Sequence, residues 1–112
     1  MKEINLFITG LGNVGSELLS IIESNSFESS SKVNVVAISN SKFMFFNKNG
    51  IDLSDWKKLL LNGEKNDREC FFEQTTKLKL KNSVFVDNTA STTIANEYEN
   101  YLSKGISVVT CN

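Results

Sequence analysis

The stretch Ile4-Asn5-Leu6-Phe7-Ile8-Thr9-Gly10-Leu11-Gly12-Asn13-Val14-Gly15 decides the fold of this chain. Apolar side chains at positions 4, 6, 7 and 8 predict a strand that is covered on both faces. Apolar residues then recur at helical spacing, at Val14, Leu18, Ile21 and Ile22. The chain is therefore expected to pass from a strand into a helix at the three glycines.

The three glycines match the pattern G-x-G-x-x-G, in which each position has its own steric reason. Gly10 permits a tight turn, Gly12 lets a diphosphate approach bare backbone, and Gly15 lets the helix pack close to the strand. The helix that begins here directs unpaired N–H groups and the positive end of its dipole at the same place. The pattern predicts an anion site, with a glycine-rich turn that binds nothing as the alternative.

Length and charge limit the class of protein. A chain of 112 residues is sufficient for one domain, covering residues 1–112, and too short for a second. A formal net charge of -1, spread along the chain, provides neither a basic stripe for nucleic acid nor a polybasic patch for membranes. No apolar run approaches the roughly 20 residues of a membrane span. Met1-Lys2-Glu3 leads straight into the first strand, so we expect no signal peptide and a cytoplasmic protein.

The reactive residue types are sparse. Cys70 and Cys111 are far apart and form no C-x-x-C motif, so reduced thiols are expected. The chain has no histidine, the commonest general base and zinc ligand, and we expect no metal site. Cys70 is interpreted as a half-buried structural thiol, because no histidine is present to activate it as a nucleophile. We therefore expect this chain to lack acid–base machinery of its own.

A second strand, residues 33–38, returns the chain to the sheet after a serine-rich loop and completes a β-α-β unit. It ends in Ser39-Asn40-Ser41-Lys42, where a dinucleotide-binding fold usually has an acidic residue that reads the ribose. Hydroxyls, an amide and a lysine do not repel a 2′-phosphate as a carboxylate does. The turn therefore favours NADP or tolerance of both cofactors, or it is simply a polar turn with a solvated lysine.

The middle of the chain shows structural signals. Phe43-Met44-Phe45-Phe46 is interpreted as core or as a cover over a sheet edge, rather than a flavin or lipid contact. The following Asn47-Lys48-Asn49-Gly50 is typical of a turn. Ser54 is expected to cap a helix that buries Trp56, Leu59 and Leu60 and ends at Gly63. Asp67 is expected to cap another helix, with Phe71, Phe72, Thr75 and Leu78 on its apolar face.

A third strand at residues 84–86 ends in Asp87-Asn88-Thr89-Ala90-Ser91-Thr92-Thr93. Ligands of open α/β sheets lie beyond the carboxyl ends of the strands, so Thr89 and Ala90 are candidates for contacts with a nicotinamide ribose. In the structural alternative, Ser91 or Thr92 caps the next helix and Asp87 is a hydrogen-bonded acid that fixes the loop.

The last helix is predicted over residues 94–103, with Ala95, Tyr98 and Leu102 facing inward and Gly105 ending it. A fourth strand follows at residues 106–110, and Cys111-Asn112 is its tip. Because the chain stops at a strand tip that points at the expected ligand crevice, we expect it to be a fragment of a longer enzyme.

Three stretches together resemble the nucleotide-binding domain of homoserine dehydrogenase, particularly the form fused behind an aspartate kinase. They are residues 8–15, residues 37–42, and the pair Val86-Asp87-Asn88-Thr89-Ala90-Ser91 and Val108-Val109-Thr110-Cys111-Asn112. The resemblance covers essentially the whole chain. It implies a Rossmann-like doubly wound α/β fold with a mainly parallel sheet and helices on both faces.

In that family, NAD(P) serves hydride transfer between aspartate 4-semialdehyde and homoserine, on the route to threonine and methionine. The resemblance implies that Gly12, Asn13 and Val14 hold the cofactor phosphates, and that Ser41 and Lys42 lie near the adenosine ribose. It places Thr89 and Ala90 near the nicotinamide ribose. It also implies a cofactor contact at Cys111, where this chain departs from the family's common proline. The family's catalytic lysine and aspartate belong to a substrate domain that also forms much of a dimer interface, and neither is present here. We thus expect cofactor binding without turnover.

Two other functions compete with this reading. One is an NAD(P)-sensing module that never had a catalytic half. The other is a methyltransferase that uses S-adenosylmethionine, but such enzymes normally have an acidic residue where this chain has Ser39-Asn40-Ser41. A P-loop enzyme is excluded because no G-K-[ST] follows the glycines.

Overall fold

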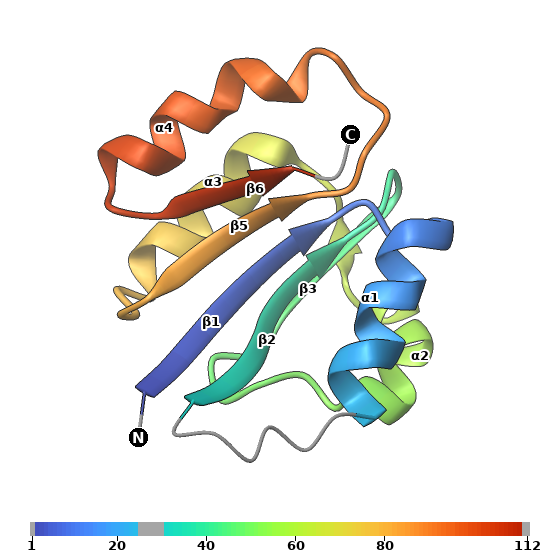
Figure 1. Cartoon of the computed structure of the whole chain (residues 1–112). Helices are drawn as coiled ribbons and strands as arrows, with labels where there is room; N and C mark the ends of the chain where they lie inside the picture. Colours follow the sequence, from blue (N-terminus) through green and yellow to red (C-terminus); the bar gives the residue numbers. More distant parts are fainter. Residues whose placement is uncertain (1, 25–30, 111–112) are drawn as a thin grey trace.

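A single mixed β-sheet runs through the molecule (Figure 1). The computed structural model describes residues 2–24 and 31–110. In these residues the sheet has six strands in the order β4-β3-β2-β1-β5-β6. The strand β3 pairs antiparallel with both of its neighbours, β2 and β4, whereas β2, β1, β5 and β6 pair in parallel. The strands are β1 (Lys2–Thr9), β2 (Ser31–Ser39), β3 (Phe43–Phe46), β4 (Glu64–Lys65), β5 (Ser83–Asp87) and β6 (Ser107–Thr110).

Helices cover both faces of the sheet. In Figure 1, α1 and α2 lie against one face, and α3 and α4 lie against the other. The helices are α1 (Asn13–Ser24), α2 (Trp56–Leu61), α3 (Arg68–Lys77) and α4 (Tyr98–Ser103), with the 3-10 turns η1 (Leu53–Asp55) before α2 and η2 (Ile94–Glu97) before α4. The predicted doubly wound α/β fold with a mainly parallel sheet is confirmed.

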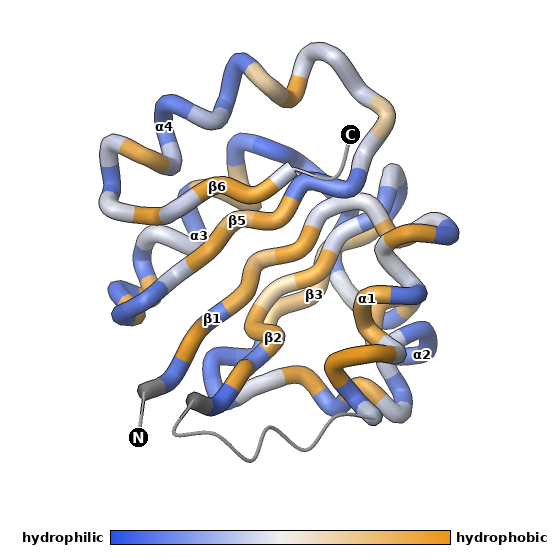
Figure 2. Tube along the Cα trace, viewed as in Figure 1, coloured by the Kyte–Doolittle hydropathy of each residue, from blue (hydrophilic) through white to orange (hydrophobic). Residues whose placement is uncertain are grey.

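The core consists of two apolar layers, one on each side of the sheet. Phe7 packs with the α3 and α4 side chains, whereas its neighbour Ile8 packs with those of α1 and α2. Both residues are fully buried, so β1 is covered on both faces as its sequence predicts. Figure 2 shows the apolar residues concentrated along the central strands.

The apolar block at residues 43–46 forms β3, a role that the sequence did not reveal. Met44 is buried in the core as expected, and the block pairs antiparallel with β2 through Ala37↔Phe46 and Ser39↔Met44. The turn after it has Gly50 at φ +104°, which confirms the need for glycine there. This strand carries the sheet beyond β2 at the end where residues 40–42 lie.

Two helix caps differ from expectation. Asp52, rather than Ser54, caps the segment before α2, and its Oδ1 accepts hydrogen bonds from the Ser54 N–H and Oγ–H. Neither Ser91 nor Thr92 caps the last helical segment, whose N-cap position is Thr93 without a side-chain cap bond. The predicted Asp67 cap is confirmed, because its Oδ1 accepts the Cys70 N–H at 3.1 Å. The predicted apolar face of α3 is also buried or half-buried, and Cys70 lies half-buried beside it.

Gly63 follows α2 for a different reason from the predicted helix stop. A β-carbon at this position would lie 2.3 Å from the Met44 carbonyl oxygen. Glycine is therefore required by the close approach of α2 to β3 rather than by a left-handed conformation.

The apolar stripes of two helices are rotated from their predicted faces. In α1, Leu19 is buried and the predicted Leu18 and Ile22 are half-buried against the same apolar layer, whereas the predicted Val14 and Ile21 are 56% and 47% exposed. At the other end of the chain, the predicted Tyr98 is half-buried against the core, but Ile94 and Tyr101 are buried in place of Ala95 and Leu102, which are exposed. The 3-10 turn η2 explains the second shift, because it advances by 120° per residue and changes the phase of the following helix.

The last described elements agree with the prediction in outline. Gly105 ends α4 with φ +76°, and β6 pairs in parallel with β5. Cys111 and Asn112, at the predicted strand tip, lie outside the described residues, as does most of the serine-rich loop. No helix among the residues that the structure describes is both long and apolar enough to cross a membrane.

Candidate functional site

The glycine turn between β1 and α1 is built by backbone contacts that exclude side chains. Gly10 has φ +90°, and a β-carbon on it would lie 2.8 Å from both the Asn88 carbonyl carbon and the Thr89 nitrogen. A β-carbon on Gly15 would lie 2.1 Å from the Gly10 carbonyl oxygen. Gly10 therefore provides the turn as predicted, whereas Gly15 lets α1 pack on the turn itself.

Gly12 differs from its two partners because it faces open space. No heavy atom lies within 4 Å of a β-carbon built there, and the residue is exposed. A glycine with no steric neighbour in the protein leaves the backbone bare for a ligand. Of the three glycines, Gly12 has the surroundings that a diphosphate contact requires.

The first turn of α1 provides the donors beside Gly12. The Ser16 N–H is the first to bond within the helix, donating to the Gly12 carbonyl at 2.8 Å. The N–H groups of Asn13, Val14 and Gly15 precede that bond and have no partner within the helix. The first turn contains no acidic side chain that would neutralise the dipole. Asn13 and Val14 are exposed, as contact with an anion at these positions requires.

At the end of β2, two of the four candidate residues hold the turn together. Ser39 is 1% exposed, and its hydroxyl shares a 2.6 Å hydrogen bond with the Thr9 hydroxyl. Asn40 accepts the N–H groups of Lys42 and Phe43 on its Oδ1, at 2.8 and 2.7 Å. Ser39 is thus enclosed in the sheet, and Asn40 keeps only its amide N–H₂ group for a ligand.

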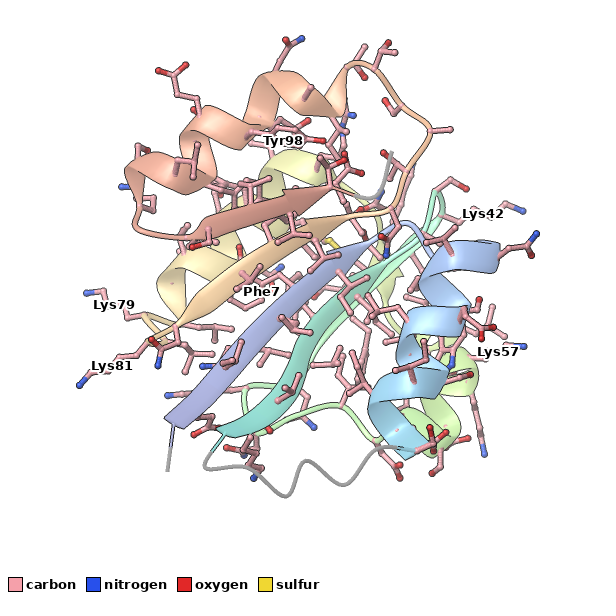
Figure 3. The ribbon with its side chains drawn as sticks, viewed as in Figure 1. Phe7, Lys42, Lys57, Lys79, Lys81 and Tyr98 are labelled. Atoms are coloured by element: carbon pink, nitrogen blue, oxygen red, sulfur yellow. The ribbon has the colours of Figure 1, made fainter. Side chains whose placement is uncertain are left out.

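The other two candidates, Ser41 and Lys42, are exposed on that turn. Figure 3 shows Lys42 at the edge of the sheet where α1 begins. The short strand β4 adds a cation that the sequence analysis did not identify, because Lys65 pairs opposite Phe43 and is exposed. The next residue, Asn66, donates its N–H to the Lys42 carbonyl at 2.8 Å. Only the pairing of β3 with β4 reveals this neighbourhood.

The loop after β5 is fixed by a buried carboxylate. Asp87 is fully buried and accepts the Thr89 N–H at 2.8 Å and the Thr89 Oγ1–H at 2.6 Å on one oxygen. Its other oxygen accepts the Tyr98 hydroxyl. Thr89 is half-buried and contacts the Gly10 turn, and the next residue, Ala90, is exposed. The structure thus brings the glycine turn and the predicted Thr89 region together.

Two unsatisfied side chains test whether this edge of the sheet fits a polar ligand. Among the described residues, the buried side-chain atoms without a hydrogen-bond partner are Asn66 Oδ1 and both Oδ1 and Nδ2 of Asn88. Asn88 lies beneath Gly15, and Asn66 lies beside Lys42. Buried polar atoms are almost always paired in native proteins. Both exceptions adjoin the predicted cofactor segments, as expected where a ligand completes the hydrogen bonding.

An ion pair closes the α3 and α4 side of the same edge. Arg68 Nε lies 3.1 Å from Glu97 Oε2, and the Arg68 guanidinium also donates to Thr93 Oγ1 at 3.2 Å. Burial raises the pKa of Glu97, the Arg68 charge lowers it, and the Asp87 charge raises it. Arg68 therefore ties the start of α3 to the loop after β5.

Hollows occur at both edges of the sheet. One of about 420 Å³ is lined by Asn88 and by residues 13–21 of α1, and it adjoins the glycine turn. A larger one of about 500 Å³, here called the amino-edge hollow, lies where β5 and β6 begin and is lined in part by Lys77, Lys79 and Lys104. Lys79 lies at the far edge from Lys42 in Figure 3. The amino-edge hollow has none of the glycine-turn features.

Comparisons with known proteins point in one direction. Residues 10–112 match the family profile described as homoserine dehydrogenase, NAD binding domain. The chain is 33% identical over 115 residues to a bifunctional aspartokinase/homoserine dehydrogenase of Haemophilus influenzae, and 36% identical over 116 residues to a homoserine dehydrogenase of Schizosaccharomyces pombe. These alignments cover 99% and 97% of this chain.

A solved structure shows the same likeness. A hyperthermophilic archaeal homoserine dehydrogenase in complex with NADPH superposes with a TM-score of 0.79 at 27% identity, covering 98% of this chain. The relatives are much longer. This chain spans 14% of the Haemophilus protein, 31% of the Schizosaccharomyces protein and 36% of the archaeal one.

Proposed function

Because the chain belongs to the homoserine dehydrogenase NAD-binding domain family, we propose that residues 1–112 form one domain that holds NADP(H) or NAD(H) across the carboxyl edge of the sheet. The single observation that carries this proposal is the open backbone at Gly12, at the start of a helix with free first-turn amides. The same edge carries the unsatisfied Asn88 and Asn66 side chains.

The diphosphate is assigned to Gly12, Asn13 and Val14. Amide donors at a helix N-terminus bind anions through hydrogen bonds and the helix dipole together. Gly10 and Gly15 contribute by shaping the turn, since neither position has room for a side chain. The unpaired amide of Asn88 is close enough to the turn to bond with the ligand after a small shift.

The adenosine half is assigned to the turn after β2. Asn40 offers its amide N–H₂ group, while Ser41 and Lys42 are exposed there and Ser39 supports the turn from within the sheet. Lys65 adds a second positive charge on the neighbouring strand. The turn itself carries one cation, Lys42, and no carboxylate, so charge complementarity favours a 2′-phosphate, and hence NADP(H).

The nicotinamide half is assigned to Thr89, which lies against the glycine turn, and to the exposed Ala90 that follows it. The contact expected at Cys111 stays a prediction, because that residue is outside the described part of the chain. Small side chains at this point leave space for the nicotinamide ribose.

The chain is proposed to serve an enzyme that interconverts aspartate 4-semialdehyde and homoserine, as the resemblance implies, and to work there as part of a homo-oligomer. When bound, the dinucleotide supplies or accepts the hydride. This chain's residues bind and orient it, and the chain has no histidine to move a proton. We expect the 112 residues to bind cofactor without oxidising homoserine.

Calorimetric titration of the chain with NADPH and with NADH tests the proposal, alongside an assay with homoserine and NADP. Saturable binding without turnover supports it. Failure of both dinucleotides to bind at millimolar concentration would contradict it.

A further inference from the structure

Tyr98 reaches the candidate nicotinamide site through Asp87. The tyrosine stands at the start of α4, and its hydroxyl donates to the Asp87 oxygen that Thr89 does not use. The Thr110 side chain at the end of β6 hydrogen-bonds to the Tyr98 oxygen in turn. Figure 3 shows Tyr98 lying between α4 and the sheet. One hydrogen-bond network thus links β6, α4, β5 and the loop after β5, and it ends at Thr89.

In this hydrogen-bond network, the chemistry of each group fixes which atom donates and which accepts. Asp87 is 0% exposed, and a buried carboxylate requires donors on both oxygens. Burial and the bond to Asp87 raise the pKa of Tyr98, so its hydroxyl keeps the proton and stays a donor at neutral pH. Without that donor, one Asp87 oxygen would be buried and unpaired, and the carboxylate would gain freedom to turn about its Cβ–Cγ bond.

Such a rotation would be transmitted directly to Thr89. Both the backbone N–H and the hydroxyl of Thr89 donate to a single Asp87 oxygen, so the loop follows that oxygen. The Tyr98 ring itself packs edge-on against Phe85, with ring centroids 6.4 Å apart. Removal of the Tyr98 hydroxyl alone therefore leaves the ring packing in place and changes only the hydrogen-bond network.

We propose that Tyr98 is a positioning residue for the nicotinamide half of the cofactor: it holds Asp87, which holds Thr89 against the ribose, and it makes no contact with the cofactor itself. This inference rests on the proposed function. It assigns a role to a side chain outside the glycine turn and outside the loop after β5. It also predicts an effect on one half of the dinucleotide only, which distinguishes positioning from general support of the fold.

The test compares two ligands on the Tyr98→Phe variant. NADPH contains the nicotinamide ribose, whereas adenosine 2′,5′-bisphosphate has only the adenosine half. The variant is expected to bind NADPH about tenfold more weakly, the loss of about 1.4 kcal/mol of binding free energy. Its affinity for adenosine 2′,5′-bisphosphate is expected to stay within about twofold of the unmodified chain, a difference below about 0.4 kcal/mol.

Tyr101→Phe provides a matched control on the same helix. It removes a phenolic hydroxyl from Tyr101, which lies three residues after Tyr98 and whose ring stacks on Phe85. The Tyr101 hydroxyl takes no part in the hydrogen bonds described above for the Asp87 oxygens, which come from Thr89 and Tyr98. Both ligands are expected to bind this variant normally. If Tyr98→Phe does not fold, Thr110→Val replaces it, because Thr110 is exposed and supports the Tyr98 oxygen from β6. A smaller shift confined to NADPH is then expected.

An equal loss for both ligands, or no loss for either, would overturn the positioning role while leaving dinucleotide binding intact. If the unmodified chain binds neither ligand, the proposed function fails and the positioning role fails with it.

Discussion

The carbonyl oxygen of Gly10 lies 2.1 Å from the place that a β-carbon on Gly15 would occupy. This contact locks the first turn of α1 onto the glycine turn, and it separates the glycines into two classes. Gly10 and Gly15 have no room for a side chain, whereas Gly12 has open space and is assigned to the ligand by the proposal. Substitutions at these positions should therefore affect different properties.

Gly12→Val is expected to fold normally and to lose cofactor binding. The valine would occupy the open space where the diphosphate is assigned, and Gly12 has no positive φ that a side chain would strain. We expect the Kd for NADPH to rise about a hundredfold or more, equivalent to about 2.8 kcal/mol. Calorimetry measures the affinity, and thermal unfolding verifies the fold.

Gly15→Ala is the contrasting variant, and it should lower the free energy of unfolding by about 1–3 kcal/mol or more, as overpacked sites do. A folded Gly12→Val protein with unchanged affinity would place the diphosphate elsewhere.

Lys42→Ala is expected to weaken NADPH binding by about fivefold to tenfold, up to about 1.4 kcal/mol, and to leave NADH binding nearly unchanged. The lysine is exposed at the turn assigned to the adenosine ribose, so only the 2′-phosphate requires its charge. Lys65→Ala should act in the same direction. The difference should shrink at about 1 M salt, where the screening length falls to about 3 Å.

Lys57→Ala serves as the control for charge, because Lys57 lies on α2 over the Trp56 ring and away from this turn. Equal weakening of NADPH and NADH by Lys42→Ala would show that the lysine does not read the 2′-phosphate.

Alkaline pH should destabilise the chain through Tyr101. Burial raises the pKa of its hydroxyl above the ordinary value near 10. Above about pH 10, the unfolded chain loses this proton while the folded chain keeps it, so the free energy of unfolding falls as pH rises. One such group contributes at most about 1.4 kcal/mol per pH unit.

Urea unfolding at pH 8 and pH 11 measures this effect, and the comparison with Tyr101→Phe isolates it from lysine titration. The variant should lose less stability than the unmodified chain between the two pH values. Parallel losses in both proteins would assign the alkaline effect to other groups.

Local sequence was sufficient to predict those features whose structure is determined within a single segment. The glycine turn follows from the sterics of Gly10 and from the change of period after it, and the Asp67 cap follows from a side chain that bonds three residues ahead. Pairing across the sheet was not accessible in this way. The block at residues 43–46 reads equally well as core or strand, and only Ala37↔Phe46 pairing decides it.

The residues of the candidate site also separate into those that local sequence predicts and those that only the three-dimensional contacts reveal. Gly12 and Lys42 were proposed from motif and position, whereas Asn88, Lys65 and Tyr98 are proposed only because of contacts between distant segments. The predicted apolar face of the last helix was correct at Tyr98 and wrong at Ala95 and Leu102, because the 3-10 turn η2 shifts the phase of the helix. Residue spacing alone gives no sign of such a turn.

The central claim is that the backbone amides at the start of α1 bind the diphosphate of a nicotinamide dinucleotide. Amide proton–nitrogen correlation spectra of the chain, recorded during a titration with NADPH, test it most directly. We predict saturable shifts that are largest at Gly12, Asn13 and Val14, and that inorganic pyrophosphate also produces at these three residues. Unmoved amides there, with shifts at Lys77, Lys79 and Lys104 of the amino-edge hollow, would contradict the claim.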